Sequence, residues 1–139
     1  MDLKAARTLL AHPLHTTEIC VLSTIESWLI NCDQLFVSHR RSIVVEIEEI
    51  DVAVLLLRAT NQETELVLAT RFVNDVRKQA DRFMLAAVKS RLDAMILEQR
   101  TSCVVWQAVR IEGEFSIREF RPLFNQFVAC ASLSAEPAA

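Results

Sequence analysis

Apolar and polar residues alternate between residues 43 and 72, and this alternation constrains the fold more than any other feature of the chain. The segment reads IVVEIEEIDVAVLLLRATNQETELVLATRF. A period near two places successive side chains on opposite sides of an extended strand. The polar residues at 60–63 interrupt the pattern and are typical of a turn. The segment therefore predicts three short antiparallel strands in a sheet with one side facing the core and the other facing solvent.

A helical interpretation of the same segment stays open. Thr60 and Glu63 have the spacing of a helix capping box, and the chain has a single glycine, which makes tight hairpin turns scarce. Apolar residues also recur at the helical spacing 4-3-4-3, at Ile43, Ile47, Ile50, Val54 and Leu57. The density of β-branched residues favours strands. We therefore favour strands, and an all-α helical bundle is the alternative.

Helical patterns precede and follow this segment. Asp2 can cap a short helix that ends by His12, before Pro13, and Thr16 can cap a second helix. The second helix has an apolar stripe of Val21, Ile25, Trp28, Leu29, Cys32 and Phe36. A third helix is expected from Asn74 or Asp75 to about Arg91.

The last part of the chain predicts a hairpin and a helix. Two strand-like runs, 94–98 and 103–111, are separated by polar residues, and Gly113 ends the second run. Ser116 and Glu119 form a capping-box pattern, with Phe115 and Phe120 placed as a hydrophobic staple, so a helix is expected to begin near 116. Pro122 is expected to kink this helix or to move its start to Arg121.

These elements predict a single α+β domain over residues 1–139, with an antiparallel sheet flanked by helices in the order α-β-β-β-α-β-β-α. Residues 1–15 are expected to form an N-terminal arm or short helix, and residues 134–139 a flexible tail. Eighteen acidic and 15 basic residues give a net charge of −3, which argues against nucleic acid and anionic membranes as partners. No apolar run is long enough to cross a membrane, and the first residues lack the apolar core of a secretory signal. A cytoplasmic protein is therefore expected.

Catalytic and metal-binding motifs are not apparent. Cys20, Cys32, Cys103 and Cys130 have no spacing typical of a zinc or redox site, and we expect them to be buried, reduced thiols. A metal site formed by His12, His15 and Cys20 is the less favoured interpretation. The chain has no glycine-rich phosphate loop and no nucleophile elbow. We expect no cofactor and no enzymatic activity.

The order of elements in a small acidic chain resembles the class I type III secretion chaperones. The resemblance covers roughly residues 17–133. It rests on the strand TELVLATRF at 64–72, the helix at 75–91, the strand pair MILE and VVWQAVRI at 95–98 and 104–111, and the closing segment FSIREFRPLFNQFV at 115–128. The resemblance implies a small dimeric, ATP-independent bacterial chaperone that keeps the N-terminal segment of an effector protein extended and competent for secretion.

The resemblance also implies two sets of site residues. The effector segment would add to a sheet edge and place apolar side chains in grooves lined by Ile25, Leu29, Phe36, Val45, Ile47, Leu56 and Leu66. A homodimer, or a heterodimer with a sister chaperone, would use Phe83, Met84, Val105 and Trp106. Ordinary hydrophobic core explains each of these positions at least as well.

Two other classes of function remain open. The all-helical interpretation predicts a structural or assembly subunit, such as a subunit of a viral particle. A winged-helix regulator would place the helix after residue 74 and the 95–111 hairpin on DNA, with Lys78, Arg82 and Lys89 on phosphates. The net negative charge argues against the regulator.

Overall fold

The structure, a computed structural model, describes residues 13–73 and 76–135. Its helices are α2 (Thr16–Asn31), α3 (Val76–Lys89) and α4 (Ile117–Ala135). Its strands are β1 (Phe36–Ser38), β2 (Ser42–Ile47), β3 (Ile50–Ala59), β4 (Glu63–Phe72), β5 (Ala94–Glu98) and β6 (Cys103–Glu112). The predicted α+β class is confirmed, and the all-helical bundle is excluded for the described residues.

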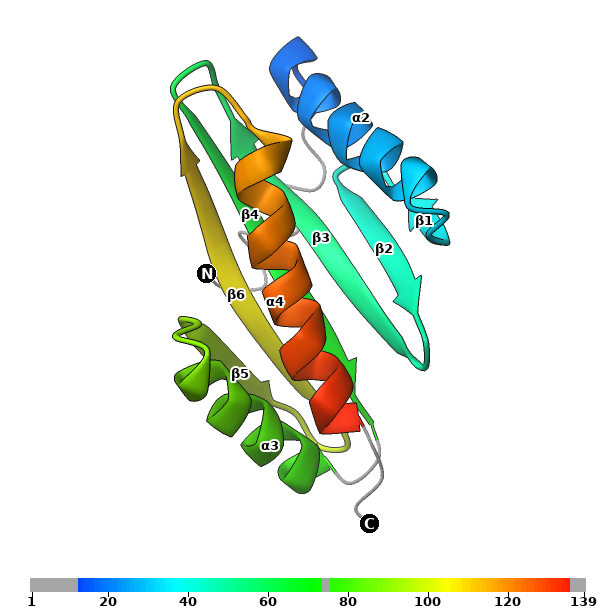
Figure 1. Cartoon of the computed structure of the whole chain (residues 1–139), viewed down its shortest axis with the longest axis vertical. Helices are drawn as coiled ribbons and strands as arrows, with labels where there is room; N and C mark the ends of the chain where they lie inside the picture. Colours follow the sequence, from blue (N-terminus) through cyan, green and yellow to red (C-terminus); the bar gives the residue numbers. More distant parts are fainter. Residues whose placement is uncertain (1–12, 74–75, 136–139) are drawn as a thin grey trace.

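The six strands form one antiparallel sheet in the order β1-β2-β3-β4-β6-β5. The three described helices lie on the same side of this sheet, with α4 across its middle, α2 over β2 and β3, and α3 beside β5 (Figure 1). The hydrophobic core fills the space between the helices and the sheet. Aromatic rings connect the helices there. The ring centroids of Trp28 in α2 and Phe124 in α4 lie 5.3 Å apart, and those of Phe83 in α3 and Phe127 in α4 lie 5.4 Å apart.

The sheet has one more strand than the sequence predicted. Phe36 was expected on the apolar stripe of the first described helix, but this helix ends at Asn31 and Phe36 begins β1. The reason lies in Asp33, whose φ of 56° is left-handed. The amide of Asp33 donates to Ile30 and that of Gln34 donates to Leu29, the pair of hydrogen bonds that closes a helix in a Schellman motif. Glycine usually occupies this position, so the stop was not recognised from the sequence.

The tight turns of the sheet form without glycine. Glu48 adopts a φ of 55° between β2 and β3, so the scarcity of glycine did not exclude a hairpin here. Between β3 and β4, the hydroxyl of Thr60 accepts hydrogen bonds from the amides of Gln62 and Glu63 at 3.2 and 3.1 Å. This arrangement is a side-chain-stabilised turn. The capping-box interpretation of Thr60 and Glu63 is therefore wrong.

The helix ends agree with the sequence only in part. Helix α2 is capped by His15, and not by Thr16, with the His15 amide donating to the Glu18 carboxylate at 3.2 Å. Helix α4 begins at Ile117 as expected, and the ring centroids of the predicted staple pair, Phe115 and Phe120, lie 6.0 Å apart.

The end of α4 differs from expectation, and two other expectations lie outside the described residues. The helix begins at Ile117 and includes the exposed Pro122, so the proline does not move its start to Arg121. It also continues to Ala135 with Ser134 buried, so the expected tail does not begin at 134. The helix expected before Pro13 and the start of α3 at Asn74 or Asp75 fall on residues that the structure does not describe.

Candidate protein-binding surfaces

The residues predicted to bind an effector come together, but inside the core. Five of the seven are fully buried, with exposed fractions of at most 2%: Ile25, Leu29, Val45, Leu56 and Leu66. Phe36 and Ile47 are half-buried and pack against the same core. All seven contribute to the core between the helices and the sheet. Their apolar character is explained by this packing, and they leave little surface for an extended segment.

The four residues predicted at a dimer interface do not share a surface. Phe83 and Val105 are fully buried in the core, with exposed fractions of 0%, and Met84 is half-buried against it. Trp106 follows Val105 in β6 and therefore points to the opposite side of the sheet. Of the four, only Trp106 lies on the side away from the helices.

That side of the sheet, which we call the open face, is apolar across its whole width. The strand register places one residue from each of the six strands in a continuous row, namely Val37, Val44, Ala53, Ala69, Trp106 and Met95. Two shorter rows of Leu55, Val67 and Ala108 and of Val104 and Leu97 lie on either side of it. None of the three described helices packs on this face (Figure 1).

The edges of the open face expose the most apolar surface. Val37 at one edge is 54% exposed, and Met95 and Leu97 at the other edge are 53% and 50% exposed. Val67 near the centre is only 7% exposed, yet it does not belong to the core cluster on the helix side. Contiguous apolar surface of this kind marks interaction sites in proteins.

Charged residues border the open face at the end near the β3–β4 turn. Arg58 pairs with Glu63 at 2.8 Å and with Glu65 at 3.2 Å, and Arg110 pairs with Glu65 at 2.9 Å and also with Glu63. The hydrogen bond from Arg110 lowers the pKa of Glu65 below its usual value, although partial burial acts in the opposite direction. This network is satisfied internally and forms a polar border to the apolar rows.

The sequence carries a signal for this surface in β3 and β4. In β3 the residues between the core positions Val52, Val54 and Leu56 are Ala53 and Leu55, so both sides of the strand are apolar. The same holds for Val67 and Ala69 in β4. A strand with one solvated side would carry polar residues at these places. The side of the sheet away from the helices is solvated, as expected, only near the ends of the strands, where Glu46 is exposed.

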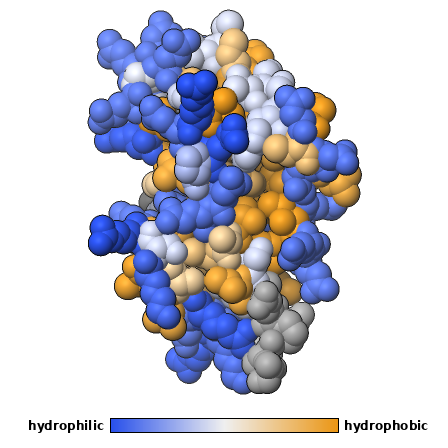
Figure 2. Space-filling view, viewed as in Figure 1, coloured by the Kyte–Doolittle hydropathy of each residue, from blue (hydrophilic) through white to orange (hydrophobic). Residues whose placement is uncertain are grey.

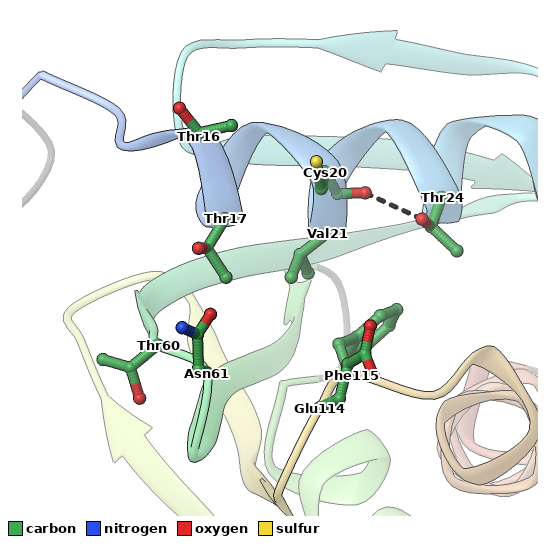
Figure 3. Close-up of a pocket in the computed structure, with 9 residues that line it drawn as sticks. All are labelled: Thr16, Thr17, Cys20, Val21, Thr24, Thr60, Asn61, Glu114 and Phe115. Carbon is green, nitrogen blue, oxygen red and sulfur yellow. Dashed lines mark hydrogen bonds between the residues drawn. The ribbon is translucent and has the colours of Figure 1, made fainter.

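A groove lies between the start of α2, the β3–β4 turn and the segment before α4, and Figure 3 shows the side chains around it. Its volume is about 450 Å³. Its lining consists of Thr16, Thr17, Cys20, Val21, Thr24, Thr60, Asn61, Glu114 and Phe115. The Thr24 hydroxyl donates to the Cys20 carbonyl at 2.7 Å and is thereby occupied within α2. The lining holds one carboxylate, that of Glu114, and one thiol, that of Cys20.

A buried ion pair lies beside this region. Arg41, at the start of β2, donates to both carboxylate oxygens of Glu18 at 2.6 and 3.0 Å, and both side chains are 4% exposed. Burial alone would raise the pKa of Glu18, but the hydrogen bonds from Arg41 and from the His15 amide outweigh it and hold the pKa below its usual value. The pair connects the first turn of α2 to the sheet and is structural.

The thiols differ from expectation. Cys103 and Cys130 are buried, but Cys20 and Cys32 are exposed on α2 and at its end. Burial, together with the nearby Glu98 carboxylate, raises the pKa of the Cys103 thiol. Within residues 13–73 and 76–135, no three histidine, cysteine or acidic side chains are grouped as metal ligands. His12, the third residue of the less favoured metal site, lies outside the described residues.

Two further observations concern the alternative partners. Lys78 and Lys89 of α3 are exposed and Arg82 is half-buried, while the β5–β6 hairpin belongs to the six-stranded sheet and does not stand apart as a wing. None of the described helices has the length and apolar character needed to cross a membrane.

Comparison with models of protein families and with curated proteins found no match. Among solved structures, the chain is similar to YbjN from E. coli, for which a role as a transcription regulator has been suggested. The sequence identity is 14%, the match covers 81% of this chain and 87% of YbjN, and the TM-score is 0.51. The similarity supports the fold and carries no information on the activity of this chain.

Proposed function

We propose that the chain is a chaperone of the class I type III secretion kind, which holds an extended segment of a client protein on the open face of its sheet. The client would be an effector whose N-terminal segment is kept extended and competent for secretion. The proposal keeps the function implied by the sequence resemblance and changes the binding site, because the grooves first expected to bind the client are filled by core residues.

The apolar row across all six strands of the open face is the observation that supports the proposal. An extended segment has side chains that alternate with a period of two, so every second residue can contact such a face. Burial of apolar surface contributes roughly 25 cal/mol per Å². A segment with apolar residues at alternate positions therefore has a physical reason to bind here, and its polar residues remain in solvent.

The polar border supports the same assignment. The Arg58, Arg110, Glu63 and Glu65 network satisfies its own charges, so it offers no unpaired charge to a specific small ligand. The apolar rows, by contrast, lie on the side of the sheet that the described helices leave uncovered (Figure 1). A surface of this type favours a protein segment over a charged metabolite.

Fluorescence of Trp106 tests the proposal. Replacing Trp28, the other tryptophan, with phenylalanine leaves Trp106 as the single reporter in the row. A peptide of alternating apolar and polar residues should shift the Trp106 emission to the blue, whereas a scrambled peptide of the same composition should not.

Variants at the edge of the face sharpen the test. Val37→Asp should raise the Kd for the alternating peptide roughly tenfold or more, because it places a charge in the apolar row. Leu133, on α4, is 58% exposed and serves as the matched control, so Leu133→Asp should bind as the parent does. Equal loss in both variants, or no binding by the parent, would contradict the proposal.

A further inference from the structure

Pro13, the first described residue, lies where the helix side of the sheet meets the open face. Its carbonyl accepts a hydrogen bond from Arg41 at 3.4 Å. It shares a cavity of about 450 Å³ with residues from both sides of the sheet, namely Ala59 of the helix side and Leu57 and Arg58 of the open face. Leu57 and Arg58 share that face because the register between β3 and β4 shifts there, as in a bulge. The chain before this corner can therefore continue onto the open face.

The segment before the first described residue reads MDLKAARTLLAH and has an amphipathic pattern. At helical spacing, Leu3, Ala6 and Leu10 fall on one side. The basic residues Lys4 and Arg7 fall on the opposite side. A helix of about ten residues is roughly 15 Å long, which equals about three spacings between neighbouring strands. The segment is therefore long enough to cross the apolar rows next to β3.

Val67, on the open face, is more buried than its surroundings explain. Its exposed fraction is 7%, although no described helix packs on this face (Figure 1). Its neighbours there include Ala69 along β4 and Ala108 across on β6, which are too small to cover it. Ala108 is itself exposed, whereas Leu55 on the other side of Val67 is half-buried. The cover over Val67 therefore comes from the side of β3, where Pro13 lies.

We infer that residues 1–12 pack on the open face over Val67 and the adjoining end of β3, so that a client must displace them. The apolar side of the segment matches the apolar rows, and its basic side remains in solvent. The groove beside α2 is the other surface within reach, but threonine, asparagine and glutamate form most of its lining. Attachment at Pro13 gives the segment an effective concentration on the order of millimolar, so a weak contact is enough to occupy the face. The competition with a client rests on the proposed function, whereas the packing of the segment does not.

A spin label on the basic side of the segment tests the packing. Cys20→Ser and Cys32→Ser remove the exposed thiols, and the other two cysteines are buried. In this background, a nitroxide attached to Arg7→Cys should broaden the NMR signals of the Val67 methyl groups far more than those of the α4 amides, which lie on the opposite side of the sheet (Figure 1). Stronger broadening of α4, or broadening of neither, would overturn the inference.

A mixed sample identifies which chain supplies the segment. Isotope-labelled chains without a nitroxide are mixed with unlabelled chains that carry the nitroxide at Arg7→Cys. The Val67 signals should stay sharp, because the segment packs on its own chain. Broadening in the mixture would assign the segment to a second copy and would overturn the inference.

Charges on the apolar side should release the segment. Leu3→Asp combined with Leu10→Asp should abolish the broadening of Val67. The same change should lower the Kd for the alternating peptide roughly tenfold, if the segment leaves the face free in about one-tenth of the parent molecules. Thr8→Asp, on the basic side of the segment, is the matched control and should leave both measurements unchanged.

The two measurements separate the packing from the proposed function. Absence of Val67 broadening in the spin-labelled chain overturns the packing, whether or not the peptide binds. Packing with an unchanged Kd in the double variant overturns the competition. If neither the parent nor the double variant binds the peptide, the proposed function fails and the competition fails with it, while the broadening still supports the packing.

Discussion

At the scale of single residues, the most informative contact is the buried ion pair between Glu18 and Arg41. A buried charge is tolerated when it is paired and hydrogen-bonded, and here the guanidinium contacts both carboxylate oxygens. Loss of Arg41 would remove the guanidinium that neutralises the buried Glu18 carboxylate. The exposed pairs of Arg58, which is 53% exposed, are expected to contribute far less.

We therefore predict that Arg41→Ala lowers the free energy of unfolding by about 3–5 kcal/mol. Arg58→Ala is the control and should cost at most about 1 kcal/mol. Urea denaturation of both variants measures the difference. Similar losses in the two variants would contradict a structural role for the buried pair.

The pH dependence follows from the lowered pKa of Glu18. Because the pKa is lower in the folded state than the usual value of 4.5, the stabilisation is fully present above that value and is lost as the pH falls through the folded pKa. The stability difference between the parent and Glu18→Gln should therefore be constant near neutral pH and should shrink in acid.

At the scale of elements, the turns of the sheet show how the chain forms hairpins with one glycine. Glu48 occupies a left-handed conformation that costs a non-glycine residue roughly 1–2 kcal/mol. The sheet pairing of β2 with β3, from Ser42 with Leu55 to Ile47 with Ile50, holds the turn in place. The strain is therefore local, and the packing of the sheet compensates for it.

Glycine at position 48 should relieve this strain. We predict that Glu48→Gly raises the free energy of unfolding by up to about 1 kcal/mol. Glycine removes the cost of the left-handed conformation, and the larger entropy of glycine in the unfolded chain offsets part of this gain. Glu49→Gly is the matched control at the neighbouring position, which has no positive φ, and should be neutral or destabilising. Thermal denaturation of both variants provides the measurement, and a lower melting temperature for Glu48→Gly would show that the turn is not strained.

At the scale of the whole molecule, the two sides of the sheet have different roles. The helix side is a filled core in which α2, α3 and α4 meet through aromatic rings, and in Figure 2 apolar surface shows between the helices. The open face carries apolar rows with no described helix on them. A side chain from α2 that points inward should therefore affect folding and not client binding.

Leu29 and its neighbour Ile30 test this division. Leu29 is 2% exposed and Ile30 is 64% exposed, although they are adjacent in the chain. We predict that Leu29→Asp lowers the free energy of unfolding by more than about 4 kcal/mol, a large share of the total for a domain of this size. Ile30→Asp should change it little. A folded Leu29→Asp variant with weaker peptide binding would return the client site to the groove first expected from the sequence.

The sequence by itself determined most of the elements. The alternation at 43–72 is a local pattern, and it correctly predicted strands there and the α+β class of the domain. The β5–β6 hairpin, Gly113 at its end and the staple that starts α4 were also correct, because each depends on neighbours within a few residues. The end of α2 was missed because an aspartate takes the conformation usually given to glycine.

Only the tertiary structure decided which side of each strand is buried by the helices. Periodicity separates Val105 from Trp106 into opposite sides, but it cannot say which side the helices cover when both sides are apolar. That choice depends on contacts between residues far apart in the chain, such as Trp28 with Phe124. Most of the residues proposed from the sequence as binding sites therefore lie in the core, whereas Trp106 lies in the apolar row of the open face. That row depends on the register of all six strands, which no local pattern encodes.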